Sequence, residues 1–363
     1  MPDERPRRLS ALAEAIDAAG LDALLVSSPA NIRYLTGFSG SSALVIVAGV
    51  HTILITDFRY KTQAPEEVGA AARVVVEPVS LWTGVWRELA ALPGVSTVGF
   101  EAAHTLHRDF QRLHESGARW QWRPTTDLVE ALRERKDAGE VAAIQRAADV
   151  AVGALRRTLE SVHVGMTELE LAGLLEHALR DGGSEGFPFA TIVAAGPRSA
   201  LPHAQPTSHR VAAGDFLLFD FGAVVDGYCS DVTRTVVVGR KASAEQREAY
   251  EVVRGAQEAA IGALRPGLSG RDADAVARSY IERHGLGELF GHSLGHGIGL
   301  EVHEAPRLAR TAEQELPAGA VVTVEPGVYR EGWGGVRIED DVWLDPTGPQ
   351  RMTNFPRELI ELV

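Results

Sequence analysis

The sequence is poor in the residues that define several protein classes. It contains one cysteine, Cys229, among 363 residues, so neither an intramolecular disulfide nor a cysteine-based zinc site is available. No apolar run approaches the roughly 20 residues that a membrane-spanning helix requires. The N-terminus lacks the apolar core of a secretory signal. These absences predict a protein of a reducing compartment, and we expect it in the cytoplasm.

Positive charge is also scarce. The chain has 36 Lys and Arg residues against 49 Asp and Glu residues, a formal net charge of −13, which argues against nucleic acid or an anionic membrane as its partner. Hydrophobic residues make up 45% and charged residues 23%, so disorder and fibrous repeats are excluded. The length exceeds the roughly 250–300 residues at which a single core stops growing, and therefore predicts two domains.

The first third of the chain alternates short apolar runs with helical stretches, which indicates an α/β layer. The predicted strands are residues 23–26, 43–47, 52–55, 73–76 and 97–100, and the predicted helices are residues 9–19, 81–92 and 106–116. The sequence Arg-Pro-Thr-Thr at 123–126 breaks this alternation. We therefore place a domain boundary there, which gives domains of residues 1–125 and 126–363.

The remainder of the chain repeats itself. Apolar residues at spacings of three or four predict a long amphipathic helix over 138–162, and capping boxes that begin at Thr167 and Ser243 predict two further helix starts. Two motifs then recur in the same order and at nearly the same separation. They are Gly165-Met166-Thr167, repeated as Gly267-Leu268-Ser269, and Gly214…Asp220-Phe221-Gly222, repeated as Gly319…Glu325-Pro326-Gly327. This pattern predicts a duplicated α+β unit with a pseudo-two-fold axis between its halves.

Two buried-strand runs end in an acid: residues 216–219 precede Asp220, and residues 321–324 precede Glu325. A carboxylate in an apolar layer is costly unless it is protonated, ion-paired or bound to a cation. Asp226-Gly227 between extended segments predicts a two-residue hairpin turn. That turn places Asp220 opposite Thr233, with Asp231 on the same face of the hairpin.

The second half repeats this arrangement. A turn over 332–335 places Glu325 opposite Glu339, so each half offers a pair of acids and the pseudo-two-fold axis brings the pairs together. Arg234 and Arg337 lie close in sequence, but no excess of Lys or Arg is evident to neutralise four ionised carboxylates. Two divalent cations would balance the charge. Oxygen-rich ligation suits Mn²⁺, with Co²⁺ or Zn²⁺ also admissible when an imidazole joins.

Three histidines, His292, His296 and His303, lie within a glycine-rich segment from Gly291 to Glu304. The spacing of His292 and His296 resembles a helical zinc-protease motif, but the residue after His292 is Ser, and four glycines make a helix unfavourable. An extended, glycine-lined segment suits close approach of the backbone to a metal or a substrate. We therefore expect these imidazoles beside the acids.

These motifs resemble those of the pita-bread metallopeptidases, and more narrowly those of the proline-specific branch of peptidase family M24: the Xaa-Pro dipeptidases (prolidases) and aminopeptidase P. The segments that carry the resemblance are 220–222, 228–235, 295–304, 324–329 and 336–340, together with 31–40 and 56–60 in the first third. The resemblance implies an α/β creatinase-like N-terminal domain followed by an α+β pita-bread catalytic domain with an internal pseudo-two-fold duplication.

The resemblance also implies roles for individual residues. The five implied metal ligands are Asp220 on one ion, His296 and Glu325 on the second, and Asp231 and Glu339 bridging both. The further implied active-site residues are His203, which would contact the substrate or the tetrahedral intermediate, His292, His303 and Arg337.

The implied reaction is hydrolysis of the peptide bond before proline, in small peptides with proline in second position. A hydroxide bridging two divalent ions would attack the carbonyl carbon while a metal and a histidine stabilise the oxyanion. Glu325 would then pass a proton to the leaving nitrogen. Mn²⁺ is the expected metal, with Co²⁺ or Zn²⁺ as alternatives. A homodimer is implied, with neither nucleic acid nor a membrane as partner.

Several alternatives share the fold. Creatinase works without metals, and an inactive peptide-binding module would be expected to have lost ligands, whereas all five occur here. Methionine aminopeptidases usually lack an upstream domain like residues 1–125. Length does not separate an Xaa-Pro dipeptidase from an aminopeptidase P that acts on longer peptides. We favour the dipeptidase, and strong turnover of Ala-Pro-Ala would reverse that choice.

Overall fold

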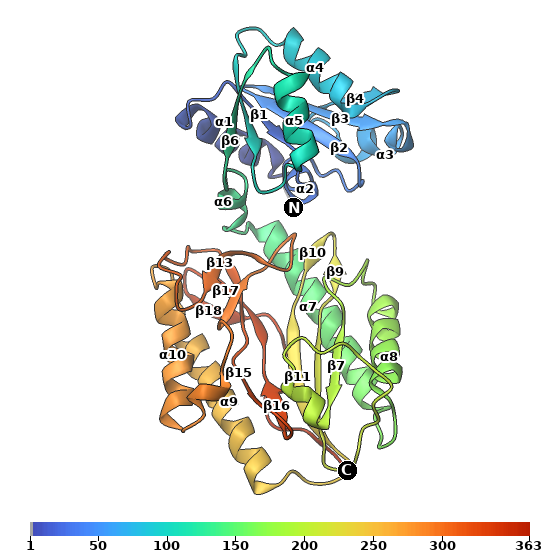
Figure 1. The fold of residues 1–363 in the computed structure, drawn as a ribbon, viewed down its shortest axis with the longest axis vertical. Helices are drawn as coiled ribbons and strands as arrows, with labels where there is room; N and C mark the ends of the chain where they lie inside the picture. The colour runs from blue at the N-terminus through green and yellow to red at the C-terminus, as the bar shows by residue number, and fades with distance from the viewer. Residues whose placement is uncertain (1–2) are drawn as a thin grey trace. The chain divides into compact units, whose positions relative to one another are not determined.

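The computed structural model describes residues 3–363 and divides into two compact units, one ending at Arg133 and the other spanning Glu134–Val363 (Figure 1). The first unit is a six-stranded sheet in the order β4-β3-β2-β1-β5-β6, mixed parallel and antiparallel. Its strands are β1 (Ala23–Val26), β2 (Ala43–Ala48), β3 (His51–Asp57), β4 (Arg73–Glu77), β5 (Thr97–Glu101) and β6 (Gln121–Thr125). Its helices are α1 (Arg5–Ala18), α2 (Pro29–Thr36), η1 (Phe58–Tyr60), α3 (Gln63–Val68), α4 (Leu81–Ala91), α5 (His107–Glu115) and α6 (Glu130–Arg133).

The eight predicted strands and helices of this unit are present, and the structure adds four short helices and β6. The chain divides after Arg133 rather than at 125/126, because the Arg-Pro-Thr-Thr segment does not end the sheet. Pro124 lies in β6, which pairs in parallel with β5 at the sheet edge. An edge strand tolerates a residue without an N–H group, since one side of the strand forms no ladder. A sequence criterion that treats proline as a strand breaker therefore places the boundary too early.

A buried polar network ties α6 to the same sheet. The Glu101 carboxylate at the end of β5 accepts hydrogen bonds from the Ser28 N–H at 2.7 Å and from Asn31 Nδ2 at 2.6 Å. Asn31 also donates to Glu130 at 2.6 Å, and its Oδ1 accepts from Arg133 Nη1 at 2.7 Å. These contacts explain why the first unit extends to Arg133.

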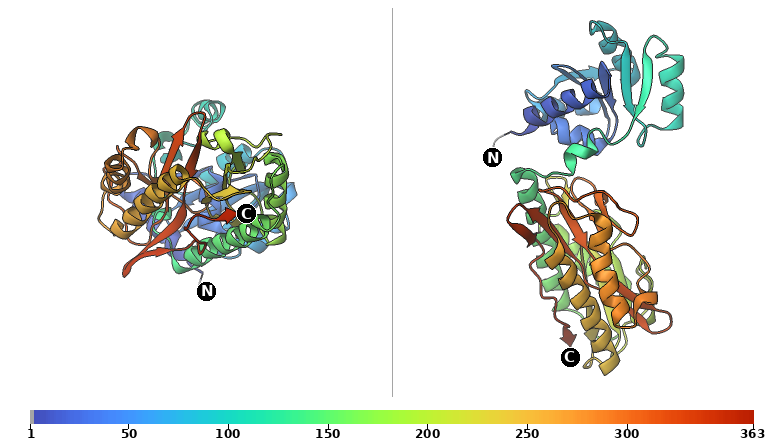
Figure 2. Two further views of the ribbon diagram at one scale, coloured as in Figure 1. Left: turned by 90° about the horizontal axis from the view of Figure 1, so that it is seen from below. Right: turned by 90° about the vertical axis from the view of Figure 1, so that its left-hand side faces the viewer.

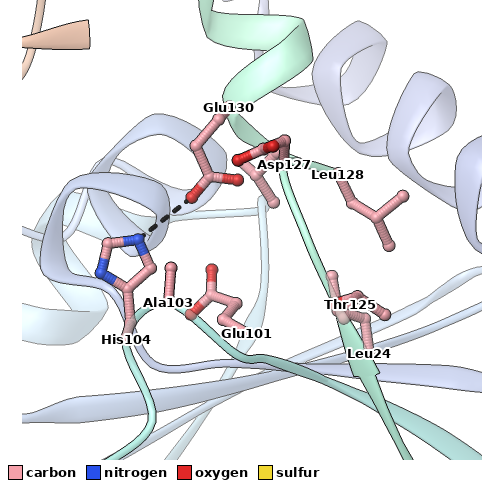
Figure 3. Close-up of a pocket in the computed structure, with 9 residues that line it drawn as sticks. Leu24, Glu101, Ala103, His104, Thr125, Asp127, Leu128 and Glu130 are labelled. Atoms are coloured by element: carbon pink, nitrogen blue, oxygen red, sulfur yellow. Dashed lines mark hydrogen bonds and ion pairs between the residues drawn. The ribbon is translucent and has the colours of Figure 1, made fainter. Parts of the chain in front are cut away.

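A small cavity lies beside this network, where His104 Nε2 points toward Glu130 at 3.2 Å (Figure 3). Its volume of about 10 Å³ is close to the room that a single water occupies. It is too small for a substrate or a cofactor.

The second unit contains two sheets, in the orders β19-β11-β8-β7 and β13-β12-β14-β17-β18, and the small ladders β9-β10 and β15-β16. Its helices are α7 (Ala138–Leu159), α8 (Glu168–Asp181), η2 (Gly196–Ala200), α9 (Ala244–Ala263), α10 (Gly270–Arg283) and η3 (Gly287–Leu289). The strands of its first half are β7 (Ile192–Ala195), β8 (Phe216–Phe221), β9 (Val224–Val225), β10 (Tyr228–Cys229) and β11 (Val232–Val238). The later strands are β12 (Gly295–Gly297), β13 (Glu304–Leu308), β14 (Val321–Val324), β15 (Gly327–Arg330), β16 (Gly334–Arg337), β17 (Asp340–Asp345), β18 (Gly348–Arg351) and β19 (Glu361–Leu362).

Each sheet of this unit packs against its own pair of helices. Apolar residues of α7 and α8 form one core with β8 and β11, and apolar residues of α9 and α10 form another with β14 and β17. Figures 1 and 2 show α7 and α8 (green) along one half and α9 and α10 (gold to orange) along the other. Asp220, near the end of β8, and Glu325, directly after β14, therefore come from sheets with separate apolar cores.

The predicted duplication is confirmed by local geometry. Thr167 and Ser269 cap α8 and α10 with their side chains, and each also forms an isolated bridge, Thr167 to Arg210 and Ser269 to Glu315. The capping boxes predicted at Thr167 and Ser243 are both formed. The glycines of the repeated motifs adopt matching positive φ angles, 94° at Gly165 and 83° at Gly267, 91° at Gly214 and 86° at Gly319.

Candidate metal centre and active site

The first acid pair lies on the hairpin that the sequence predicts. β8 and β11 pair with Asp220 opposite Thr233, and the turn is Asp226-Gly227. Both turn residues have positive φ, 50° and 75°, the conformation that a tight two-residue hairpin turn requires. Asp231 directly precedes β11, and its N–H donates to Asp341 Oδ2 in the second half at 3.0 Å.

The residues of the second acid pair lie opposite each other, as the sequence predicts. The ladders β14-β17 and β15-β16 share one register, Val324 opposite Asp340 and Gly327 opposite Arg337, and Glu325 and Glu339 lie between these two ladders. The predicted register is therefore confirmed.

The two halves also meet directly. Thr233 Oγ1 donates to Glu339 Oε2 at 2.6 Å, and the Glu339 N–H donates to the Thr233 carbonyl at 3.1 Å. These contacts hold the first hairpin against the second.

Asp220, Asp231, Glu325 and Glu339 are here called the acid quartet, and the pKa values of the last three are raised. Burial raises the pKa of Asp231 and of Glu339 well above the usual carboxyl range, and the neighbouring carboxylates raise both further. Burial likewise raises the pKa of Glu325 to about 8. Asp231 Oδ1 is buried without a hydrogen-bond partner among residues 3–363. The quartet therefore requires either protons or cations to be stable.

One member of the quartet has a protein counter-charge, supplied by one of the two arginines that lie close in sequence. Arg337, only 3% exposed, forms an ion pair with Asp220. Arg234 instead pairs with Asp340 at 2.7 Å, outside the quartet. One guanidinium cannot neutralise four carboxylates, so protons or a bound cation must balance the remaining charge.

An imidazole completes a compact donor set. Ligand atoms of Asp231, His296 and Glu339 lie within 4.8 Å of one another, and His296 Nε2 lies 3.5 Å from Glu325 Oε1. His296 Nδ1 donates to the Gly297 carbonyl at 3.0 Å, so the lone pair of Nε2 faces the acids. Burial lowers the pKa of His296 to about 4, which keeps the ring in the neutral form that ligates metals.

The donor set fits a divalent cation. Buried carboxylates with one neutral imidazole are the ligands that Mn²⁺, Co²⁺ and Zn²⁺ accept. The unpartnered Asp231 Oδ1 and the raised pKa values both identify charge that the described chain does not itself satisfy.

Three further histidines gather around the quartet. The His303 ring lies 4.3 Å from that of His296. Burial lowers the pKa of His292 to about 4 and also lowers that of His303, and electrostatic interaction with His203 contributes to both shifts. A cavity of about 700 Å³ opens beside His292 and is also lined by Arg310.

Tyr329 has no role in the sequence interpretation but joins the implied residues. Its hydroxyl bonds to His292 Nε2 at 2.9 Å and accepts from Arg337 Nη1 at 2.7 Å. Burial raises the pKa of Tyr329 to about 12, so the phenol remains protonated. The chain Asp220–Arg337–Tyr329–His292 thus connects an acid of the quartet to a histidine. The signal that the sequence carries for it is its place at the end of segment 324–329, one of the segments that carry the family resemblance.

Arg307 was also missed. It lies directly opposite His296 in the β12–β13 ladder, so the two side chains share one face. Its charge contributes to lowering the pKa of His296 and of His303. Arg307 is exposed, and among residues 3–363 its side chain forms no ion pair or hydrogen bond. An unpaired cation therefore lies at the edge of the site.

Comparison with known proteins identifies the family of this chain. The profile described as the Creatinase/Prolidase N-terminal domain matches residues 8–135, and that of Metallopeptidase family M24 matches residues 142–346. The chain belongs to metallopeptidase family M24. It therefore combines a creatinase-type first domain with a pita-bread catalytic domain, the fold class predicted from the sequence.

The proteins similar to this M24 chain include some named Xaa-Pro dipeptidase and others named X-Pro aminopeptidase. An Xaa-Pro dipeptidase of Pyrococcus horikoshii is 34% identical over 97% of this chain and 98% of its own length. A solved structure titled Xaa-Pro dipeptidase from Bacillus anthracis superposes with a TM-score of 0.95 at 38% identity, covering 99% of this chain and 100% of that one. The structure of an X-Pro aminopeptidase from Thermotoga maritima gives a TM-score of 0.91 at 37% identity, with coverage of 99% and 100%.

No helix in the described part of this metallopeptidase is long and apolar enough to cross a membrane.

Proposed function

We propose that this chain is an Xaa-Pro dipeptidase that hydrolyses the bond before a C-terminal proline with the help of two divalent metal ions. The observation that carries the proposal is the acid quartet: two pairs of carboxylates, one from each half, face one another beside a neutral His296. Asp220, Asp231, His296, Glu325 and Glu339 would hold the ions, Mn²⁺ being the preferred metal. When bound, the ions would supply Lewis-acid activation of a water and of the scissile carbonyl.

The side chains around the quartet account for the rest of the reaction. The oxygen of water adds to the carbonyl carbon, the C–N bond to proline breaks, and the proline nitrogen receives a proton. Glu325, which would bind an ion through one carboxylate oxygen, would take a proton of the attacking water on its other oxygen and deliver it to the leaving nitrogen. His203 and His303 would donate hydrogen bonds to the negative charge that develops on the carbonyl oxygen.

The neighbours of His292 give it a defined tautomer. Its Nδ1 donates to the Ser293 carbonyl at 2.8 Å, so Nε2 accepts from Tyr329. Arg337 holds Tyr329 in turn. These hydrogen bonds fix the orientation of the His292 ring, and the ion pair of Arg337 holds Asp220 in place.

Arg307 supports the dipeptidase over an enzyme for longer peptides. A dipeptide ends in a free carboxylate immediately after the scissile bond, and an unpaired guanidinium opposite His296 is a suitable partner for it. A longer peptide would place an uncharged amide there. The exposed guanidinium of Arg307 would then have no substrate carboxylate to bind.

The test compares hydrolysis of Ala-Pro with that of Ala-Pro-Ala in the wild type and in Arg307→Met. We expect the wild type to prefer Ala-Pro, and the substitution to raise KM for Ala-Pro by about 10-fold or more, since a charge-assisted hydrogen bond contributes about 1.5–3 kcal/mol. Arg123→Met, at an exposed position of β6, is the matched control and should leave KM unchanged. Faster turnover of Ala-Pro-Ala by the wild type would identify an aminopeptidase instead.

We further propose that the enzyme is a homodimer and works in the cytoplasm. The single Cys229 forms no disulfide within the chain, which suits a reducing compartment. Sedimentation equilibrium should give twice the chain mass, and a monomer would refute that part of the proposal.

A further inference from the structure

The loop between β7 and β8 carries His203, and the position of this histidine depends on how the loop is held. The loop starts with the short helix η2 and continues without regular structure to β8. His203 itself is exposed, and its side chain forms no hydrogen bond within residues 3–363. It nevertheless lies close enough to His292 and His303 to affect their pKa values. Contacts elsewhere in the loop must therefore place it there.

Those contacts converge on Glu168, the first residue of α8, which is fully buried at 0% exposure. Its Oε1 accepts from the Ala195 N–H at 2.9 Å and from Arg198 Nε at 3.0 Å. Its Oε2 accepts from the Thr207 N–H at 2.9 Å, from Thr207 Oγ1 at 2.8 Å and from the same Arg198 nitrogen at 3.0 Å. One carboxylate thus binds the chain on both sides of His203.

Arg198 extends this clamp inside the loop. Its Nη2 donates to the Gln205 carbonyl at 2.8 Å, two residues beyond His203. This hydrogen bond closes the backbone from Arg198 to Gln205 into a short loop, and His203 is one of the residues of that loop.

The duplicated half shows that the fold does not need an acid at this position. Thr167 and Ser269 are equivalent helix caps, so Glu168 corresponds to Gly270 at the start of α10. A Cβ atom at Gly270 would lie 2.0 Å from the Arg307 carbonyl oxygen, so not even a methyl group fits there. The α10 helix starts well without a carboxylate, and the first turn of α8 already has the exposed Glu170 in its capping box. A buried charge is costly unless hydrogen bonds satisfy it, and every such bond of Glu168 goes to the His203 loop or its flanks.

We infer that Glu168 is a positioning residue for the reaction: it clamps the 195–207 loop and so fixes His203 at the substrate. This inference rests on the proposed function for its effect on catalysis. The clamp itself rests on the hydrogen bonds alone.

The first test measures the loop directly. In Glu168→Gln, one acceptor oxygen becomes a donor that faces the N–H groups of the loop, so trypsin should cleave after Arg198 at least about 10-fold faster than in the wild type. Glu170→Gln is the matched control, because Glu170 lies on the same helix and bonds to Thr167 instead. Equal cleavage rates in wild type and Glu168→Gln would overturn the clamp, whatever the enzyme hydrolyses.

The second test is a double-mutant cycle with Ala-Pro as substrate. Glu168→Gln should lower kcat by about 10- to 100-fold, since misplacing a group that contacts the reacting atoms costs that much. Metal content should match that of the wild type. In the His203→Ala background the same substitution should cost little further activity, because the clamp acts through His203. Fully additive losses would show a general structural role and refute the inference.

Two outcomes need separate variants or controls. If Glu168→Gln does not fold, Thr207→Val, which removes one donor to the carboxylate, should give a smaller change of the same sign in both tests. If the wild type does not hydrolyse Ala-Pro, the proposed function fails, while the proteolysis comparison still decides whether Glu168 holds the loop.

Discussion

The side chain of Asp231 presents the electrostatic difficulty of the site most clearly. It is buried among Glu339, Asp220, Asp341 and Glu325, all of which raise its pKa after burial itself. Its Oδ2 lies 3.8 Å from His296 Nε2, and its Oδ1 has no hydrogen-bond partner in the described chain. A divalent ion bound between these groups would satisfy both the orphaned oxygen and the excess charge.

We predict that Asp231→Asn abolishes metal retention and lowers activity on Ala-Pro by at least about 100-fold, because even loss of a group that only orients a ligand costs 10- to 100-fold. Metal analysis after dialysis and steady-state kinetics measure the two effects. Asp226→Asn is the control, since Asp226 lies on the same hairpin with its side chain 66% exposed. Normal metal content in Asp231→Asn would contradict the assignment of this residue.

The raised pKa values predict a proton effect on metal binding. Asp231, Glu339 and Glu325 hold protons in the metal-free protein at pH values where ordinary carboxyls are ionised, Glu325 up to a pH of about 8. Metal binding must therefore release protons, and affinity for Mn²⁺ should fall as the pH is lowered below about 8. Calorimetry in buffers of different ionisation enthalpy measures the release, and binding without proton release would contradict these pKa directions.

The same shifts fix the sign of a stability effect. A carboxyl whose pKa is raised by folding stabilises the folded state while it is protonated, so its contribution is present below the usual value of 4.5 and is lost as the pH rises toward about 8. The melting temperature of the metal-free protein should therefore fall as the pH rises toward about 8, because these acids become ionised while buried. Bound Mn²⁺ should remove that loss.

Among the elements, β12 depends on close backbone approach. A Cβ atom at Gly295 would lie 2.1 Å from the Thr323 carbonyl oxygen of β14, and His296 directly follows. The absence of a side chain thus allows β12 to approach β14 and sets the position of a proposed ligand.

We predict that Gly295→Ala separates these strands, lowers the free energy of unfolding by about 1–3 kcal/mol and weakens Mn²⁺ binding. Denaturant unfolding and metal titration test this. Gly291→Ala, in the same segment but with no atom within 4 Å of the added Cβ, should leave both quantities near the wild-type values. Equal behaviour of the two variants would show that the close approach is unimportant.

Local sequence predicted some of these elements well for a physical reason. A two-residue turn fixes the register of the strands it joins, so Asp226-Gly227 was sufficient to place Asp220 opposite Thr233. The pairing of Arg337 with Asp220 was not accessible in the same way, since it joins residues from different halves.

Other features escaped because their signals are weak or misleading. Arg307 faces His296 only through a ladder whose register shifts between His296 and Gly297, and no turn rule predicts such a shift. Pro124 led to the prediction of a domain boundary where the structure has an edge strand. Asn31 belongs to a motif that resembles the first domain of the family, but its buried contacts to Glu101 and Arg133 follow from the assembled sheet.

At the scale of the whole molecule, neither half of the second unit contains a complete centre. The first half supplies Asp220 and Asp231, and the second supplies His296, Glu325 and Glu339. Because the proposed ligands join the two halves, metal binding should also stabilise the fold. A metal present at 100 times its dissociation constant adds about 2.7 kcal/mol.

Metal titration of the stripped wild-type protein tests the central claim most directly. Protein freed of metal with a chelator is titrated with Mn²⁺ while bound metal and Ala-Pro hydrolysis are measured in the same samples. The proposed centre predicts no hydrolysis at the start and activity that rises in step with occupancy to about two ions per chain. Full activity of protein proven to be free of metal would contradict it.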